Sequence, residues 1–81
     1  KTEIINKIFV ITGKLTQYKN RSALQADIES RGGKVVGSVS KNTNYLINND
    51  NTSSSAKNVA AQKLGVPVLT EAEFIEKFLT N

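Results

Sequence analysis

The sequence contains no cysteine and no histidine. Without cysteine, the chain can form neither a disulfide nor a thiolate metal site. The absence of both residue types also excludes zinc sites, Ser-His-Asp triads and thiol nucleophiles. We therefore expect no metal site and no catalytic residue. Methionine is absent as well, and excision of one domain from a longer protein is the simplest interpretation of a chain that begins at Lys1.

The sequence also has no long apolar run. None of its segments approaches the ~18 residues of a membrane span, and no signal-peptide core is visible. We therefore expect no membrane partner, and a cytoplasmic or nuclear location is the default. A chain of 81 residues suits one domain, which buries roughly 60% of its unfolded surface. This size leaves room for one core and for no deep cleft between two domains.

Basic residues are concentrated in one part of the chain. Residues 1–50 hold eight Lys and Arg against four Asp and Glu, whereas residues 51–81 hold three of each. The whole net charge of +4 therefore comes from the first part. Solvated lysines are the simpler interpretation of this excess, and a basic face that meets polyanions is the alternative.

Apolar residues predict four short strands. Residues 8–11 are apolar without alternation, which is typical of a strand buried on both faces of a parallel sheet. Further strands are expected at residues 35–36, 45–47 and 66–69. The last should lie at a sheet edge because it contains Pro67. Helices between these strands imply right-handed crossovers and a parallel sheet covered on both sides, in the order βαββαβα.

Capping residues mark the expected helix ends. The first helix follows a polar loop, begins at Asn20 or Ser22, and ends at the Gly-Gly pair of residues 32–33. The last helix begins with Thr70 and Glu73, which have the spacing of a capping box.

The second helix is expected at about residues 56–64, with an apolar stripe of Ala56, Ala60 and Leu64 and with Val59 beside it. The expected core residues are Phe9, Val10, Ile11, Leu24, Ile28, Leu46, Leu64, Val68, Phe74 and Phe78.

Two features of the sequence indicate one candidate site. Thr12-Gly13 follows the first strand, at the edge where open α/β sheets bind ligands. Lys57 lies in the first turn of the second helix, where a cation opposes the positive end of the helix dipole. A hydroxyl, a free backbone N–H, a helix N-terminus and an ammonium together suit a phosphate. A simple surface lysine is the alternative, and the residues alone leave both open.

The sequence gives little support to a P-loop or to catalysis by paired carboxylates. A P-loop is excluded, because Ile8 stands where its first glycine belongs and Leu15 where its Ser or Thr belongs. Glu71, Glu73 and Glu76 on the last helix suit the positive end of the helix dipole, and we expect no catalytic role for them.

Five segments occur in an order and spacing that is specific only as a set: FVITGKL at 9–15, IESRGGKV at 28–35, SVSKNTNYLI at 38–47, KLGV at 63–66 and EAEF at 71–74. Together they resemble the BRCT family over about residues 5–79. Within that family, the pattern is most similar to the C-terminal module of bacterial NAD-dependent DNA ligases. The large subunit of the eukaryotic clamp loader is a near second. The resemblance makes residues 1–81 a single BRCT domain taken from a larger protein.

The resemblance implies an α/β fold with a four-stranded parallel sheet of order 2-1-3-4 flanked by three helices. It also implies a phosphate pocket formed by the Thr-Gly pair and by a lysine that opens the second helix. Clamp-loader modules add an arginine at the start of the first helix. The expected phosphate- and DNA-binding residues are therefore Thr12, Gly13, Lys57, Arg21 and Lys14.

The sequence departs from the ligase pattern at several positions. Ligase modules usually carry Gly-Glu after the third strand and Gly-Ser before the lysine, where this chain has Asn48-Asn49 and Ser55-Ala56. A second lysine expected three residues after the first is Ala60. Phe74 replaces the tryptophan of phosphopeptide-binding modules, as it does in ligases. These departures bear on the parent protein and on the strength of DNA contact.

We expect a non-catalytic accessory module of an NAD-dependent DNA ligase that contacts DNA phosphates at nicks or ends in replication and repair. The module itself needs no cofactor, because NAD, Mg and Zn would belong to other domains of the parent. The alternative is a phosphopeptide- or protein-interaction module of another repair or replication factor. The expected partners are nicked or 5′-phosphorylated DNA or a phosphorylated protein, together with the parent's other domains. We expect a monomer in the bacterial cytoplasm, with the nucleoid.

Overall fold

The structure, a computed structural model, describes residues 3–50, 52 and 54–79. The elements follow one another as β1 (Ile8–Ile11), α1 (Arg21–Ser30), β2 (Lys34–Val35), β3 (Tyr45–Ile47), α2 (Ala56–Leu64), β4 (Val68–Leu69), α3 (Glu71–Phe74) and a π-helical turn, η1 (Ile75–Leu79). Within the described residues, the four strands form one parallel sheet of order β2-β1-β3-β4. The expected fold class, sheet order and helices are confirmed.

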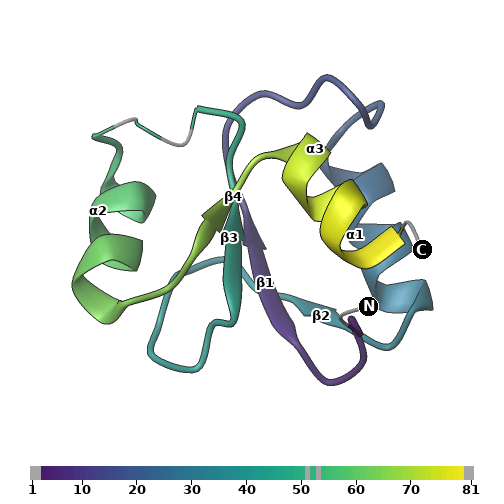
Figure 1. Cartoon of the computed structure of the whole chain (residues 1–81), viewed down its shortest axis with the longest axis horizontal. Helices are drawn as coiled ribbons and strands as arrows, with labels where there is room; N and C mark the ends of the chain where they lie inside the picture. Colours follow the sequence, from purple (N-terminus) through teal and green to yellow (C-terminus); the bar gives the residue numbers. More distant parts are fainter. Residues whose placement is uncertain (1–2, 51, 53, 80–81) are drawn as a thin grey trace.

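Helices cover both faces of the sheet (Figure 1). Helix α2 lies alone on one face, and α1 and α3 lie on the other. Alternate residues of β1 point to opposite faces. Phe9 and Ile11 therefore join the core beneath α1 and α3, while Val10 joins Ala61 in the smaller core beneath α2. This is why an uninterrupted apolar run was needed at residues 8–11.

Aromatic rings fill the larger core. The ring of Phe9 stacks on the ring of Tyr45, with 5.6 Å between centroids. It makes T-shaped contacts with the rings of Phe74 and Phe78, at centroid distances of 5.7 and 5.6 Å. Because Phe74 belongs to α3 and Phe78 to η1, these contacts dock the C-terminal helix onto β1 and β3. The N-terminus of α3 is thereby fixed beside the loops that follow those strands.

The N-termini of α1 and α3 are capped by the expected residues, and the structure decides between the two candidates for α1. Asn20, not Ser22, caps α1, and its side-chain oxygen accepts the N–H of Ala23 at 2.9 Å. Thr70 and Glu73 form the reciprocal capping box, with bonds of 3.1 and 2.9 Å. Strand β4 with the preceding Pro67 lies at the sheet edge, as expected.

The expected bounds of helix α2 are confirmed, but the expected buried face of this helix was wrong. Leu64 is 43% exposed and Val59 38% exposed, whereas Asn58 and Ala61 are buried. The small side chain of Ala61 packs with Val10 and Leu46, and Asn58 faces inward because its amide has polar partners there. The spacing of apolar residues could not predict this buried face, since the face includes the polar residue Asn58.

Smaller corrections concern other elements. Val68 is only partly buried, and Ile4, Ile47 and Val66 are core residues that we had not expected. Strand β2 is Lys34–Val35 and not 35–36, and β4 covers only Val68–Leu69. The other eight expected core residues are buried.

Candidate phosphate-binding site

A cavity of about 460 Å³ opens at the carboxyl ends of β1 and β3. Two loops form it, the β1–α1 loop and the β3–α2 loop, which lie at the same end of the sheet (Figure 1). Ligands of open α/β sheets bind at this edge. The cavity is lined by Thr12, Gly13, Lys14, Asn48, Asn49, Asp50 and Ser55. Of the β3–α2 loop, residues 51 and 53 lie outside the described residues.

Gly13 brings the two loops close together. Its backbone φ is +80°, a value that residues other than glycine rarely adopt. A Cβ at this position would also lie only 2.5 Å from the side-chain oxygen of Asn48. The N–H of the preceding Thr12 continues the sheet by donating to the Ile47 carbonyl at 2.9 Å. The N–H of Gly13, by contrast, makes no hydrogen bond with the described part of the chain. Gly13, which lines the cavity, therefore has a backbone donor that no described residue uses.

Glu71 holds the β1–α1 loop in place. Its side chain is completely buried, and its carboxylate accepts backbone N–H bonds from Thr16 at 2.6 Å, Gln17 at 3.1 Å and Tyr18 at 2.9 Å. Burial by itself raises the pKa of this carboxyl group. The hydrogen bonds from these N–H groups and from Asn49 outweigh burial and hold the pKa below its usual value. Glu71 is therefore an ionised anchor.

Asn49 joins that anchor to the cavity. Its side-chain oxygen accepts the N–H of Glu71 at 2.8 Å, and its amide nitrogen donates to the Glu71 carboxylate. The same nitrogen lies 3.1 Å from the carbonyl of Lys14, to which it also donates. Asn49 and Lys14 both line the cavity, so a continuous set of hydrogen bonds runs from the buried carboxylate to the cavity wall.

A ring of neutral groups holds the β3–α2 loop. The buried Asn48 side chain donates to Asn58 at 2.9 Å and accepts the N–H of Asp50 at 3.0 Å. Asn58 in turn donates to the carbonyl of Asp50 at 3.1 Å. Both asparagines are nearly inaccessible to solvent, with 3% and 2% exposure, and their amides satisfy one another. This ring fixes the start of the loop against the first turn of α2.

Tyr18 secures the far end of the β1–α1 loop. Its hydroxyl donates to Asp27 of α1 at 2.6 Å, and Asp27 also accepts from Arg31 at 3.0 Å. Burial, together with the hydrogen bond to Asp27, raises the pKa of Tyr18 far above its usual value. The phenol therefore stays neutral and donating at physiological pH. The loop is thus held to α3 by Glu71 and to α1 by Tyr18.

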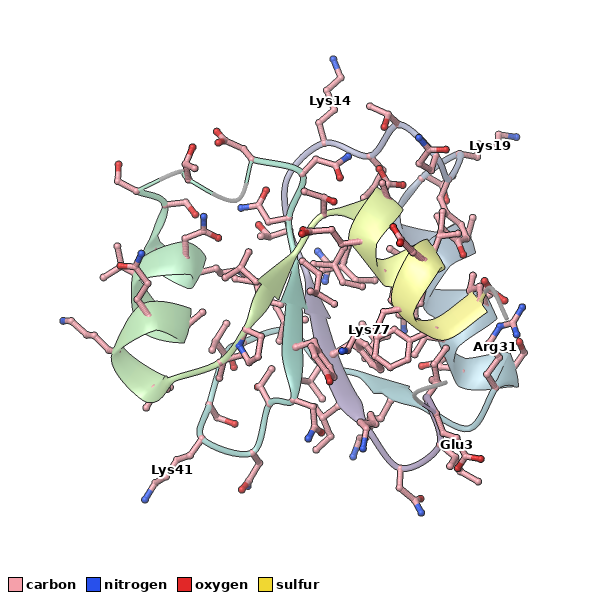
Figure 2. All side chains as sticks on the ribbon, in the orientation of Figure 1. Glu3, Lys14, Lys19, Arg31, Lys41 and Lys77 are labelled. Atoms are coloured by element: carbon pink, nitrogen blue, oxygen red, sulfur yellow. The ribbon has the colours of Figure 1, made fainter. Side chains whose placement is uncertain are left out.

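Three of the five expected site residues lie together. Thr12, Gly13 and Lys14 line the cavity, and the Lys14 side chain extends outward from its rim (Figure 2). Lys57 and Arg21 are not among the lining residues. Lys57 is partly buried two positions after Ser55, the lining residue that caps α2, and Arg21 is exposed at the first position of α1. Their role in binding stays a prediction.

Sequence reasoning missed Asn48, Asn49 and Glu71 as builders of the site. The two asparagines were noted only as departures from a pattern, and Glu71 only as an acid that suits a helix start. The available signal was a polar Asn-Asn-Asp run directly after a buried strand, since such residues bond readily to nearby backbone groups.

Two features are absent from the described residues. No group of three or more His, Cys, Asp or Glu side chains there could hold a metal ion. None of the helices in that part of the chain has the length and apolar character needed to cross a membrane.

Comparison with known proteins adds independent findings. The family model described as the BRCA1 C Terminus (BRCT) domain matches residues 5–77. A DNA ligase of Lachnoclostridium phytofermentans is 60% identical over 68 residues, or 84% of this chain and 10% of the ligase. A DNA ligase of Ruminiclostridium cellulolyticum is 55% identical over 71 residues, or 88% of the chain and 11% of the ligase. The chain therefore spans about a tenth of the length of these relatives.

Proposed function

This chain belongs to the BRCT family, and we propose that it is a non-catalytic, DNA-binding module of a DNA ligase. In this role it contacts DNA phosphates at nicks or 5′-phosphorylated ends during replication and repair. Similarity to segments of DNA ligases supports a ligase as the parent. We further propose that the parent is NAD-dependent, that its NAD, Mg and Zn sites lie in other domains, and that it acts in the cytoplasm.

The proposal rests on the N–H of Gly13, a cavity-lining residue, which has no hydrogen-bond partner among the described residues. A phosphate oxygen is an acceptor that suits an unused backbone donor, and the Thr12 hydroxyl and the start of α2 lie at the same cavity. Lys14 at the rim supplies positive charge, and the net charge of +4 favours the approach of a polyanion. These groups recognise phosphate and not base edges, so binding should be nearly independent of sequence.

The charge of the cavity lining favours weak binding. Asp50 lies on the same lining as Lys14, so the two side chains offset each other. Affinity should therefore depend on a few phosphate contacts and decline steeply with salt, by a slope of about 0.9 per contact on logarithmic axes. A module of this kind contributes a positioning contact to a larger enzyme.

The test is a titration of labelled nicked duplex, with and without the 5′-phosphate, over a series of salt concentrations. We expect Lys57→Ala to weaken binding and to reduce the salt slope by roughly one contact. Lys63→Ala is the matched control, because it removes the same charge from the last turn of the same helix. Lys41→Ala is a second control, because Lys41 extends from the opposite end of the molecule to Lys14 (Figure 2).

The outcomes separate the candidate functions. Tighter binding with the 5′-phosphate, lost in Lys57→Ala but kept in both controls, supports the proposal. Equal binding by Lys57→Ala would move the DNA contact to Lys14, Lys19 or Arg21, or to Lys41 if Lys41→Ala itself binds more weakly than the wild type. Undetectable binding at about 50 mM salt would contradict DNA binding by the isolated chain, because phosphate contacts are strongest at low salt. It would favour the protein-interaction alternative.

A further inference from the structure

Glu71 is an unusual residue for its position. It is completely buried, and burying a carboxylate is costly unless hydrogen bonds compensate the lost hydration. None of the lysines and arginines among the described residues forms an ion pair with it. Its partners are instead the N–H groups of Thr16, Gln17 and Tyr18 and the side chain of Asn49. The carboxylate is therefore used to order a loop.

The loop that Glu71 orders lacks other internal support. Residues 13–20 form neither helix nor strand, so their N–H groups have no partner within regular secondary structure. Two carboxylate oxygens accept three consecutive N–H groups, which fixes the backbone path over Thr16 to Tyr18. Because only Leu15 separates Gly13 and Lys14 from this segment, their position depends on that path as well as on the end of β1.

Asn49 provides a second connection between Glu71 and Lys14. Asn49 bonds to both the backbone and the side chain of Glu71 and donates to the carbonyl of Lys14. Asn49 lines the cavity, but Glu71 does not. The carboxylate therefore lies one layer behind the wall, where four N–H donors share its charge. In that place it can orient the wall without itself meeting a phosphate.

We propose that Glu71 is the positioning residue of the phosphate cavity, setting the place of Gly13 and Lys14 through the Thr16–Tyr18 backbone and through Asn49. This rests on the proposed function, because it assigns the residue that orders the same site. Removal of the anchor leaves the phosphate-contacting groups in the chain but lets them move. Affinity for 5′-phosphorylated DNA then falls even in folded protein.

The test compares Glu71→Gln with Glu73→Gln in the 81-residue chain. Both variants lose one negative charge from the same helix. Glutamine keeps the capping box at residue 73, whereas at residue 71 its amide N–H₂ would face N–H donors. We expect Glu71→Gln to weaken binding of 5′-phosphorylated nicked duplex by about tenfold, as the loss of an orienting partner does at metal sites. Glu73→Gln should change affinity by less than about twofold.

Two further readouts separate positioning from stability. Binding is measured at a temperature where circular dichroism shows each variant to be folded. Amide hydrogen exchange should accelerate at Thr16, Gln17 and Tyr18 in Glu71→Gln, and the amide resonances of Gly13 and Lys14 should shift in the free protein. A role confined to stability would leave those two resonances and the affinity of the folded variant unchanged, and this result would overturn the proposal.

Asn49→Ala covers the case in which Glu71→Gln does not fold. It removes the second connection and leaves the carboxylate with its three backbone partners. We expect the Lys14 resonance to shift and affinity to fall, with exchange at Thr16 to Tyr18 little changed. Wild-type affinity in Asn49→Ala and Glu71→Gln would overturn positioning while leaving DNA binding intact. If the wild type itself binds no DNA, the proposed function fails, and the resonances of Gly13 and Lys14 alone decide whether Glu71 positions them.

Discussion

The two loops that line the cavity are held by different chemistry. The β1–α1 loop depends on the ionised carboxylate of Glu71, which accepts three consecutive backbone N–H groups. The β3–α2 loop depends on the neutral ring of Asn48, Asn58 and the Asp50 backbone. Both anchors are buried side chains, but only the first changes its charge with pH.

The difference follows from what each loop requires. The segment from Thr16 to Tyr18 presents several donors in a row, and a carboxylate is an acceptor with room for about four bonds. Asp50 presents one donor and one acceptor to its anchor, which a pair of amides satisfies without charge. The cavity therefore has one anchor that is strong and pH-dependent and a second that is weaker and independent of pH.

The largest effect should come from Glu71→Ala. The change leaves three backbone donors and the Asn49 amide without their acceptor, and hydrogen bonds to charged groups contribute about 1.5–3 kcal/mol each. Because such losses are not additive, we expect the free energy of unfolding to fall by about 3–5 kcal/mol. Urea denaturation measures this. A loss under about 1 kcal/mol would show that the loop does not depend on the carboxylate.

Removing the neutral anchor should lower the free energy of unfolding by a smaller amount. Asn58→Ala leaves the Asn48 amide and the Asp50 carbonyl unsatisfied, which should cost about 1–3 kcal/mol. Adding Asn48→Ala to Asn58→Ala should cost less than the sum of the single changes, because both remove the same ring. The double-mutant cycle in urea checks this. Strictly additive losses would mean that the two asparagines act separately.

Acid should produce the smallest effect and distinguish the two anchors directly. The pKa of Glu71 in the folded protein lies below its ordinary value of 4.5. Its stabilising contribution is therefore present in full above about pH 4.5 and is lost as the pH falls through the folded-state pKa. Unfolding experiments at several pH values should show this decline in the wild type and in Asn58→Ala. The decline should be reduced in Glu71→Gln, and identical pH profiles for all three proteins would contradict it.

The sequence allowed the frame of the molecule to be predicted, because that frame depends on apolar patterns and caps. The run at residues 8–11, the cap at Asn20 and the box of Thr70 and Glu73 each act through neighbouring residues. Thr12 and Gly13 could be placed at the cavity, since they follow a strand directly.

The Glu71 anchor could not be predicted, because it depends on contacts between distant parts of the chain, whereas the neutral ring joins residues ten or fewer positions apart. Glu71 meets Thr16 across 55 positions, and Asn49 meets Lys14 across 35. The inward face of α2 was predicted wrongly for a different reason, because helical periodicity does not show where the β3–α2 loop places Asn48 and Asp50. Leu64 is exposed and Asn58 buried because a polar partner in another loop outweighs the apolar pattern of the helix.

The most direct measurement is a titration of the isotope-labelled chain with nicked duplex, followed through the amide resonance of Gly13. We predict that this resonance and that of Thr12 shift saturably with 5′-phosphorylated DNA, and much less with the same duplex lacking the phosphate. Resonances of Lys41 and Lys34, which do not line the cavity, should change little. A Gly13 resonance that stays in place while DNA binds would contradict the claim that the cavity holds a DNA phosphate.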